Sequence, residues 1–291
     1  NSMTIKKVGV IGCGLMGHGI AQVAAVSGCT VTVCEADSGA LEKGLGRINK
    51  SLSKLVEKEK IAQADADAAT ARITGTGDIA DLKDCDLVVE AIVENLDIKN
   101  KLFGDLGKLC KPETIFASNT SSFPVSEMGA ASGRPERMVG LHFFNPVQLM
   151  KLVEVVRTPA TSDEVFAEAK AFGEACGKVP VAASDTPGFV VNRLLVPYLA
   201  EAIRMVERGD STPADVDAGM TLGCGYPMGP FTLLDYVGLD TTMFILEGWV
   251  EKYPNESLFE VPALLRQKVQ EGKLGRKTGE GFFKWEGDKR A

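Results

Sequence analysis

The chain has 291 residues and a formal net charge of -7, with 45% hydrophobic and 24% charged residues. This length favours one large domain followed by a smaller one, and the composition is that of a globular protein rather than a disordered one. The negative charge argues against a nucleic-acid-binding surface, which needs basic groups to neutralise phosphates. An anionic ligand would therefore need basic groups gathered locally.

The seven cysteines show no metal-binding pattern. They include no CxxC pair and no zinc-ligand spacing, so no structural metal is expected. Their odd number and apolar neighbours predict buried free thiols in a reducing compartment. No apolar run reaches the roughly twenty residues that cross a bilayer. Asn1 and Ser2 precede the expected native start, Met3, and no signal peptide is expected.

The N-terminal part of the chain alternates between strand and helix patterns. An apolar run that stops at glycines, a helical pattern and a β-branched run follow one another over residues 6–11, 15–27 and 30–34. Further strands are predicted at 71–75, 86–91, 114–118, 138–142, 152–156 and 179–182, with helices at 96–109 and 163–176. Such alternation predicts an α/β domain of the Rossmann type, a doubly wound parallel sheet covered on both faces.

A long helical insertion separates the second and third predicted strands. Residues 40–71 carry apolar side chains at helical spacing together with many lysines, which predicts an inserted helical hairpin. The insertion is longer than an ordinary crossover. Two interpretations stay open, a solvated amphipathic pair of helices or an arm that reaches over a ligand.

The sequence pattern changes after the segment Asp185-Thr186-Pro187-Gly188. Beyond it we find no convincing alternating strand, and residues 190–208 and 231–252 are predicted as long amphipathic helices. We therefore expect a sheet domain over 4–187 and an all-α domain over 188–291. Helices this apolar expose more surface than about one hundred residues can bury, which predicts a homodimer through the helical domain.

A GxGxxG motif lies directly after the first predicted strand and at the start of the first helix. Gly12 is expected to make the tight turn, Gly14 to let the backbone approach a pyrophosphate, and Gly17 to allow close packing of helix on strand. The helix N-terminus, at Leu15 and Met16, would then stabilise the phosphate charge. The motif in this context predicts a dinucleotide site.

The choice of dinucleotide depends on Glu35, which ends the next predicted strand. A carboxylate at this position can accept hydrogen bonds from both ribose hydroxyls and would repel a 2'-phosphate, so NAD is favoured over NADP. The alternative is a structural glycine-rich turn beside an ordinary acidic residue at a strand end.

The two histidines of the chain differ in their expected surroundings. His18 lies inside the first predicted helix, where packing or solvent contact is expected. His142 ends a strand, and in a doubly wound sheet the carboxyl ends of the strands line the ligand crevice. A neutral imidazole there suits general-base chemistry, although a merely hydrogen-bonded histidine would occupy the same position.

Glu154 lies in an otherwise apolar strand, so its carboxylate needs a partner. If the partner is His142, the carboxylate fixes the tautomer of the imidazole and stabilises the imidazolium that forms when the ring takes a proton. The alternative is a structural salt bridge with a lysine or arginine.

Two further groups of polar residues stand near predicted strand ends or the domain boundary. The loop 118–122, which includes Ser121, could hold an alcohol oxygen or the carboxamide of nicotinamide. Asn192 stands at the entry of the second domain, where its amide could donate to a carbonyl oxygen or cap a helix.

Together these residues resemble one family, the short-chain (S)-3-hydroxyacyl-CoA dehydrogenases, including bacterial 3-hydroxybutyryl-CoA dehydrogenases. The matching stretches follow in order along nearly the whole chain: Gly12–Gly28, Val88–Glu94, Ala117–Ser122, Gly140–Pro146, Met150–Val155, Asp185–Arg193, Tyr226–Pro230 and Gly275–Phe283. Such a set is far more specific than the dinucleotide motif alone. Glu35 departs from the aspartate that relatives often carry, and both acids can hold a ribose.

The resemblance implies roles for individual residues. It implies that His142 is the base, that Glu154 orients it, and that Ser121 and Asn192 position the substrate oxygens. The residues that it places around NAD are Glu94, Lys99, Ser121, Asn145 and Lys277. It also implies that Ser51 and Lys58, on the predicted hairpin, contact CoA.

The resemblance implies an enzyme that oxidises (S)-3-hydroxyacyl-CoA reversibly to 3-oxoacyl-CoA with NAD, and it leaves mitochondrial matrix and bacterial cytoplasm open as compartments. A rival hydroxyacid dehydrogenase with a lysine base would need a lysine at the domain junction, and residues 185–195 contain none. A second rival is a non-catalytic NAD-binding relative, but a structural role would need none of the chemistry of the polar residues named above.

Overall fold

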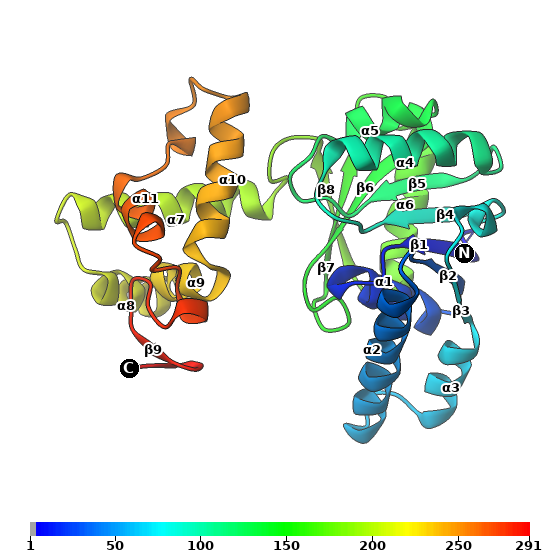
Figure 1. Ribbon diagram of the computed structural model, residues 1–291, viewed down its shortest axis with the longest axis horizontal. Coiled ribbons are helices and arrows are strands. Elements are labelled where there is room, and N and C mark those ends of the chain that lie inside the picture. The colour runs from blue at the N-terminus through cyan, green and yellow to red at the C-terminus, as the bar shows by residue number, and fades with distance from the viewer. Residues whose placement is uncertain (1–3) are drawn as a thin grey trace. The chain divides into compact units, whose positions relative to one another are not determined.

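The computed structural model describes residues 4–291, so the expected start at Met3 lies outside the described residues. The chain forms two compact units, one ending at Phe189 and one spanning Val190–Ala291 (Figure 1). The sequence-based boundary follows residue 187, against residue 189 here. Each unit has a hydrophobic core of its own.

The first unit is built on an eight-stranded sheet with the strand order β3-β2-β1-β4-β5-β6-β7-β8. Its strands are β1 (Lys7–Ile11), β2 (Thr30–Cys34), β3 (Ile73–Thr76), β4 (Leu87–Glu90), β5 (Ile115–Ser118), β6 (Met138–Phe143), β7 (Leu152–Arg157) and β8 (Val179–Ser184). The strand order reverses between β1 and β4, and ligands bind at such a switch point, outside the carboxyl ends of the strands.

One pairing departs from the predicted parallel sheet, because β6 and β7 are antiparallel. All other pairings of this sheet are parallel. A parallel neighbour requires a crossover, usually a helix, whereas residues 144–151 connect these two strands without one. As a result His142 and Glu154 stand directly opposite each other in the register.

Helices cover both faces of the sheet (Figure 1). On one face α1 (Leu15–Val26) and α6 (Asp163–Ala175) share a buried core with the strands. On the other face α4 (Leu96–Leu109) and α5 (Val125–Ser132) contribute to a second core, together with the short turn η1 (Ile79–Leu82). The sequence had not predicted α5, which is followed by the turn η2 (Pro135–Arg137). The doubly wound α/β fold is confirmed.

The helical hairpin inserted between β2 and β3 is confirmed and consists of α2 (Ser38–Glu57) and α3 (Gln63–Ala71). Asp37 caps α2, since its carboxylate accepts hydrogen bonds from the N–H groups of Gly39 and Ala40. The residues of α2 that are buried lie on one side, at Gly44, Ile48 and Leu52. A Cβ placed on Gly44 would lie 2.0 Å from the Sγ of Cys13, so α2 passes closely over the glycine-rich turn.

The second unit is helical, with α7 (Val191–Glu207), α8 (Pro213–Cys224), α9 (Pro230–Val237), α10 (Leu239–Lys252) and α11 (Ala263–Gln270), and with the short turns η3 (Ser257–Phe259) and η4 (Arg276–Thr278). The prediction of one helix over 231–252 is wrong, because Gly238, with φ of 103°, separates α9 from α10. The sequence also missed α8, α11 and a small hairpin of β9 (Trp285–Glu286) and β10 (Lys289–Arg290).

Buried Asp235 joins the C-terminal segment to α9. Its carboxylate accepts hydrogen bonds from the backbone N–H groups of Phe282 and Phe283 and from the indole of Trp285. Burial nevertheless raises the pKa of Asp235 above its usual range.

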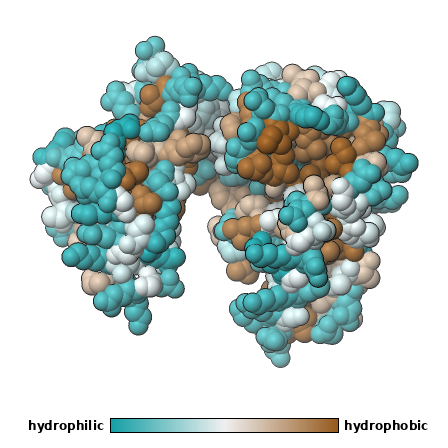
Figure 2. All heavy atoms as spheres, viewed as in Figure 1, coloured by the Kyte–Doolittle hydropathy of each residue, from teal (hydrophilic) through white to brown (hydrophobic). Residues whose placement is uncertain are grey.

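The surfaces of both units combine hydrophilic residues with exposed hydrophobic ones (Figure 2). In the second unit the most exposed large apolar side chains are Leu222, Phe244 and Leu194, at 88%, 73% and 69%. Across residues 4–291, no helix has the length and apolar character that spanning a membrane requires.

Candidate active site

The glycine-rich turn joins β1 to α1, and its first and last glycines are required by packing. Gly12 has a φ of 100°, and a Cβ on it would lie 2.4 Å from the carbonyl oxygen of Ala91. A Cβ on Gly17 would lie 2.0 Å from the carbonyl oxygen of Gly12. At Gly14, by contrast, a Cβ would meet no described atom within 4 Å, so the backbone there borders open space.

The start of α1 suits a pyrophosphate. Gly14 is the N-cap residue of α1 and brings no capping side chain, so the first N–H groups of the helix can donate to phosphate oxygens. The side chain of Leu15 is 58% exposed and that of Met16 is half-buried. His18 is buried, with Nδ1 lying 2.7 Å from the carbonyl oxygen of Gly14, which agrees with the packing role expected for it.

Glu35 follows β2 and lies beside this turn. Its Oε2 accepts a hydrogen bond from the N–H of Cys13 at 3.2 Å. The half-buried carboxylate is thereby held next to the start of α1, where a ribose attached to the pyrophosphate would lie. The residues of the turn and Glu35 fit NAD.

A cluster of charged residues lies at the carboxyl end of β4, the strand beside β1. Lys99 and Glu90 form a buried ion pair, at 1% and 0% exposure of their side chains. The Nζ of Lys99 also lies 2.9 Å from Oε1 of Glu94, whose side chain is 43% exposed. We call these three residues the Glu90–Lys99–Glu94 cluster.

The cluster is joined to the loop after β5. Oε2 of Glu94 accepts hydrogen bonds from the hydroxyls of Thr120, at 3.0 Å, and Ser122, at 2.7 Å. Oε1 of Glu90 accepts one from the hydroxyl of Ser118 at 2.6 Å. The half-buried Ser121 stands between two residues that are held by Glu94.

His142 and Glu154 form a buried pair at the end of β6. Nδ1 of His142 lies 2.8 Å from Oε1 of Glu154, and the two residues are 7% and 0% exposed. Since Nδ1 faces a carboxylate, the neutral imidazole carries its proton there, and its lone pair is on Nε2. The antiparallel pairing of β6 and β7 therefore supplies the partner that the sequence predicted for Glu154.

The surroundings of His142 are aromatic. The rings of Phe144 and Phe189 have their centroids 4.7 Å and 5.6 Å from that of His142. One residue beyond His142, the N–H of Phe143 donates to Oδ1 of Asn119 at 2.8 Å, which joins the end of β6 to the loop that carries Ser121.

The segment before Phe189 is anchored to the start of α5. The carboxylate of Asp185 accepts hydrogen bonds from the N–H groups of Val125 and Ser126, both at 2.9 Å. Sequence reasoning missed this contact and that of Asn119, because both join residues far apart in the chain. Glu90 was missed although it shows the same pattern as Glu154, a carboxylate in an apolar strand.

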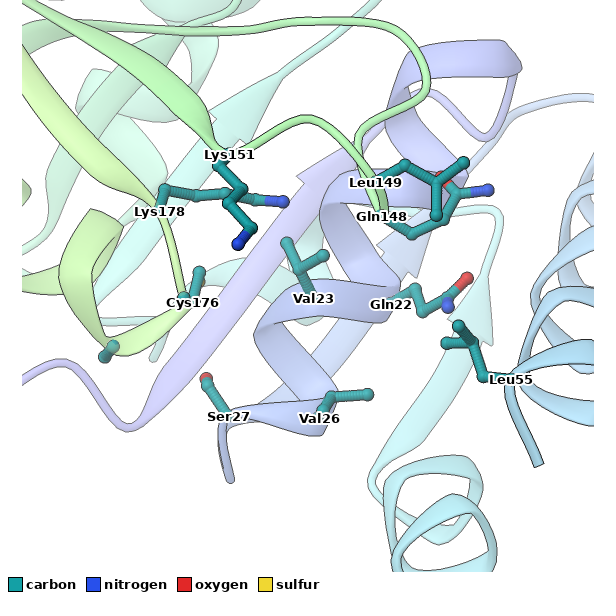
Figure 3. Close-up of a pocket in the computed structure, with 12 residues that line it drawn as sticks. Gln22, Val23, Val26, Ser27, Leu55, Gln148, Leu149, Lys151, Cys176 and Lys178 are labelled. Atoms are coloured by element: carbon teal, nitrogen blue, oxygen red, sulfur yellow. The ribbon is translucent and has the colours of Figure 1, made fainter. Parts of the chain in front are cut away.

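The expected CoA contacts, Ser51 and Lys58, lie on α2 and at its C-cap. Ser51 is half-buried and Lys58 is exposed. Between them, Leu55 lines an open groove of about 330 Å³, in which it faces Gln22 and Val26 of α1 and the loop with Gln148, Leu149 and Lys151 (Figure 3). Gln22 is 1% exposed, and its Oε1 is buried without a hydrogen-bond partner among the described residues.

The remaining predicted site residues lie elsewhere. Asn145 is exposed in the segment after β6. In the second unit, Asn192 is half-buried in the first turn of α7, and Lys277 in η4 pairs with Asp240, with Nζ 2.7 Å from Oδ1.

The cysteines are free but not all buried, contrary to the expectation, since Cys176 is half-buried and Cys224 is exposed. Burial raises the pKa of Cys85 and Cys176 to about 12. The described residues contain no group of three or more His, Cys, Asp or Glu side chains that could hold a metal ion.

Comparisons with known proteins agree along the whole chain. Residues 7–186 match the NAD binding domain of 3-hydroxyacyl-CoA dehydrogenase, and residues 188–285 match its C-terminal domain. A mitochondrial hydroxyacyl-coenzyme A dehydrogenase from Rattus norvegicus is 51% identical over 287 residues, which cover 97% of this chain and 91% of the relative. A probable 3-hydroxybutyryl-CoA dehydrogenase from Deinococcus radiodurans is 51% identical over 279 residues, covering 96% of this chain and 100% of the relative.

A solved structure of (S)-3-hydroxybutyryl-CoA dehydrogenase from Ralstonia eutropha is similar throughout. It superposes with a TM-score of 0.94 at 40% identity, covering 97% of this chain and 100% of that one. With both family domains matched in order, the chain belongs to the 3-hydroxyacyl-CoA dehydrogenase family.

Proposed function

We propose that this protein is an NAD-dependent dehydrogenase that oxidises the hydroxyl group of a short- to medium-chain (S)-3-hydroxyacyl-CoA, such as 3-hydroxybutyryl-CoA, reversibly to the ketone. The reaction belongs to fatty-acid β-oxidation or butanoate metabolism. The observation that carries the proposal is the buried pair of His142 and Glu154 at the carboxyl end of β6, in a sheet whose β1–α1 turn suits NAD. Relatives named for this activity support it.

His142 acts as the general base. With Nδ1 held by Glu154, Nε2 is the nitrogen that takes the proton of the substrate hydroxyl. The carboxylate of Glu154 stabilises the imidazolium that results, and in the reverse direction the same ring returns the proton. When bound, NAD supplies the acceptor for the hydride that leaves the substrate carbon bearing this hydroxyl.

The substrate and cofactor contacts follow the family assignments. Ser121 holds the reacting oxygen together with His142, and Asn192 donates to the thioester carbonyl. The NAD contacts are the turn Gly12–Gly17 with Leu15 and Met16, Glu35, Glu94, Lys99, Ser121, Asn145 and Lys277.

The CoA part of the substrate binds at α2. Lys58 provides a positive charge on an acidic protein, and Ser51 provides a hydroxyl on the same side of the helix, one turn from Leu55. The groove beside Leu55 offers apolar surface from Leu55, Val26 and Leu149. These features support an arm that contacts the ligand over a merely solvated hairpin.

The helical domain also forms a homodimer, for which the support is its exposed apolar side chains. Mitochondrial and bacterial relatives are equally similar, so mitochondrial matrix and bacterial cytoplasm both remain as proposed compartments.

The first experiment measures the oxidation of NADH with acetoacetyl-CoA, beside free acetoacetate and beside NADPH in place of NADH. We expect rapid turnover only with NADH and the CoA ester, because free acetoacetate lacks the part that binds α2. Binding of NADH without turnover at any acyl length would instead indicate a non-catalytic NAD-binding relative.

A further inference from the structure

We infer that a basic stripe on α2 binds the phosphate groups of CoA and thereby makes the protein selective for CoA thioesters over thioesters of an unphosphorylated carrier. The stripe consists of Arg47, Lys50, Lys54 and Lys58. This inference rests on the proposed function, in which α2 contacts CoA through Ser51 and Lys58. It adds three basic residues to that contact and gives them the task of recognising the phosphates.

The four residues of the stripe share one side of α2. With a rotation of about 100° per residue, their Cα atoms fall within about 80° of one another around the helix axis. With a rise of about 1.5 Å per residue, the stripe extends about 16 Å from Arg47 to the C-cap residue Lys58. The C-terminal half of α2 extends away from the sheet (Figure 1), and Lys50, Lys54 and Lys58 are exposed, whereas Arg47 is half-buried.

The positive charges of the stripe are not neutralised by acidic side chains. The ion pairs among residues 4–291 include none of its four members. In the register of α2, Glu57 lies beside Lys50, on the side of the stripe away from Ser51. The whole chain has a net charge of -7, so unpaired basic groups gathered at one place attract an anionic ligand to that place.

The stripe borders the residues that the proposed function assigns to CoA. Ser51 is four residues from Arg47 and three from Lys54, so these residues are neighbours on the helix surface. Leu55 follows Ser51 by four residues and lines the groove (Figure 3). Around α2 the order is therefore basic, hydroxyl and apolar, which matches the order from the phosphates of CoA to its less polar pantetheine arm.

The phosphates of CoA need more than one basic partner. The nucleotide half of CoA carries a pyrophosphate and a 3'-phosphate, whereas Lys58 offers a single ammonium group with three donors. Arg47 adds a planar guanidinium that can donate to two phosphate oxygens at once, and Lys50 and Lys54 add charges on flexible stems. Pantetheine lacks these phosphates, so the stripe contributes nothing to the binding of its thioesters.

Neutralising two lysines of the stripe tests the inference. The substitution Lys50→Gln with Lys54→Gln removes two exposed charges and nearly preserves helix propensity. The oxidation of NADH is followed with acetoacetyl-CoA and with S-acetoacetyl-pantetheine. We expect the KM for acetoacetyl-CoA to rise by about 10-fold at low salt, the size expected for two exposed charge pairs. The KM for the pantetheine thioester should stay near that of the wild type, and so should kcat with acetoacetyl-CoA, because substrate that is bound still reacts at His142.

Matched controls separate the charge of the stripe from other effects. Lys50→Arg with Lys54→Arg keeps both charges and should keep the KM for acetoacetyl-CoA near that of the wild type. Lys83→Gln with Lys108→Gln removes the same charge from exposed positions after η1 and in the last turn of α4, and it should also leave this KM unchanged. Added salt should reduce the difference between the wild type and the neutral variant, because it screens exposed charges.

Three outcomes would overturn the inference. An unchanged KM for acetoacetyl-CoA in the neutral variant would mean that the stripe does not bind the phosphates. An equal rise with both thioesters would mean that the two lysines act on α2 itself, and an equal rise in the Lys83 and Lys108 variant would mean that only the total charge matters. A wild-type protein that turns over neither thioester would instead refute the proposed function.

Discussion

At the scale of single residues, the chemistry depends on a histidine whose two nitrogens have different tasks. Burial of Glu154 at 0% exposure makes its carboxylate a strong partner for Nδ1, since no water competes for it there. The aromatic rings of Phe144 and Phe189 restrict the imidazole further. The ring is therefore preorganised for proton transfer through Nε2.

The substitution His142→Gln tests this arrangement. We expect turnover to fall by about 10²- to 10⁴-fold, the range typical of a lost general base, because glutamine cannot take the proton. NADH affinity should stay near that of the wild type, since His142 is not among the proposed NAD contacts. Steady-state turnover and fluorescence titration measure the two quantities, and turnover close to that of the wild type would refute the assignment of the base.

At the scale of secondary-structure elements, the site is assembled from segments that follow different strands of one sheet. The turn after β1, Glu35 after β2, the cluster at the end of β4, the loop after β5 and His142 in β6 all lie at carboxyl ends. The antiparallel β7 then brings Glu154 to His142 from the opposite direction. Helix α2 passes over the glycine-rich turn between β1 and α1, where its Gly44 lies against Cys13.

Two glycines of α2 give opposite predictions for the same change to alanine. In Gly44→Ala the new methyl group would collide with Cys13, so we expect destabilisation and weaker NADH binding as α2 moves off the turn. In Gly46→Ala the Cβ would meet no described atom within 4 Å, so the variant should be about 0.5–1 kcal/mol more stable, through helix propensity. Denaturant titration measures both, and equal stability changes would contradict the close contact of α2.

At the scale of the whole molecule, the second unit has apolar side chains that its own core does not bury. Twelve of its apolar residues form a buried cluster, yet Leu222 and Phe244 remain largely exposed. Exposed side chains of this size on a helical unit are typical of a surface that another copy covers.

The double substitution Leu222→Asp with Phe244→Asp tests the proposed dimer. We expect the wild type to have the mass of a dimer by light scattering and the variant to have that of a monomer, because charges oppose burial in an apolar interface. Val179→Asp serves as the control, since Val179 is 62% exposed on the edge strand β8 of the first unit and should leave the mass unchanged. A variant that remains dimeric would refute the participation of these two side chains in the interface.

The amino-acid sequence by itself determined whatever depends on local pattern. Hydrophobic periodicity predicted the strands of the sheet, the hairpin α2–α3 and the helices α1, α4, α6 and α7, and the GxGxxG motif predicted the dinucleotide turn. The buried carboxylate of Glu154 predicted a partner, because an unpaired charge in an apolar strand is too costly to persist. Short elements with little periodicity, such as α5 and α8, escaped prediction.

Only the tertiary structure decided which of these groups meet. Residues between 12 and 60 positions apart meet in three places. These are the antiparallel pairing of β6 with β7, the capping of α5 by Asp185, and the hydrogen bonds that join Glu90 and Glu94 to the loop containing Thr120. Local pattern carries no information about such pairs, because they arise from strand order and register. For the same reason Lys99 could be recognised in the sequence as part of the site, while its place beneath the surface became apparent only in the fold.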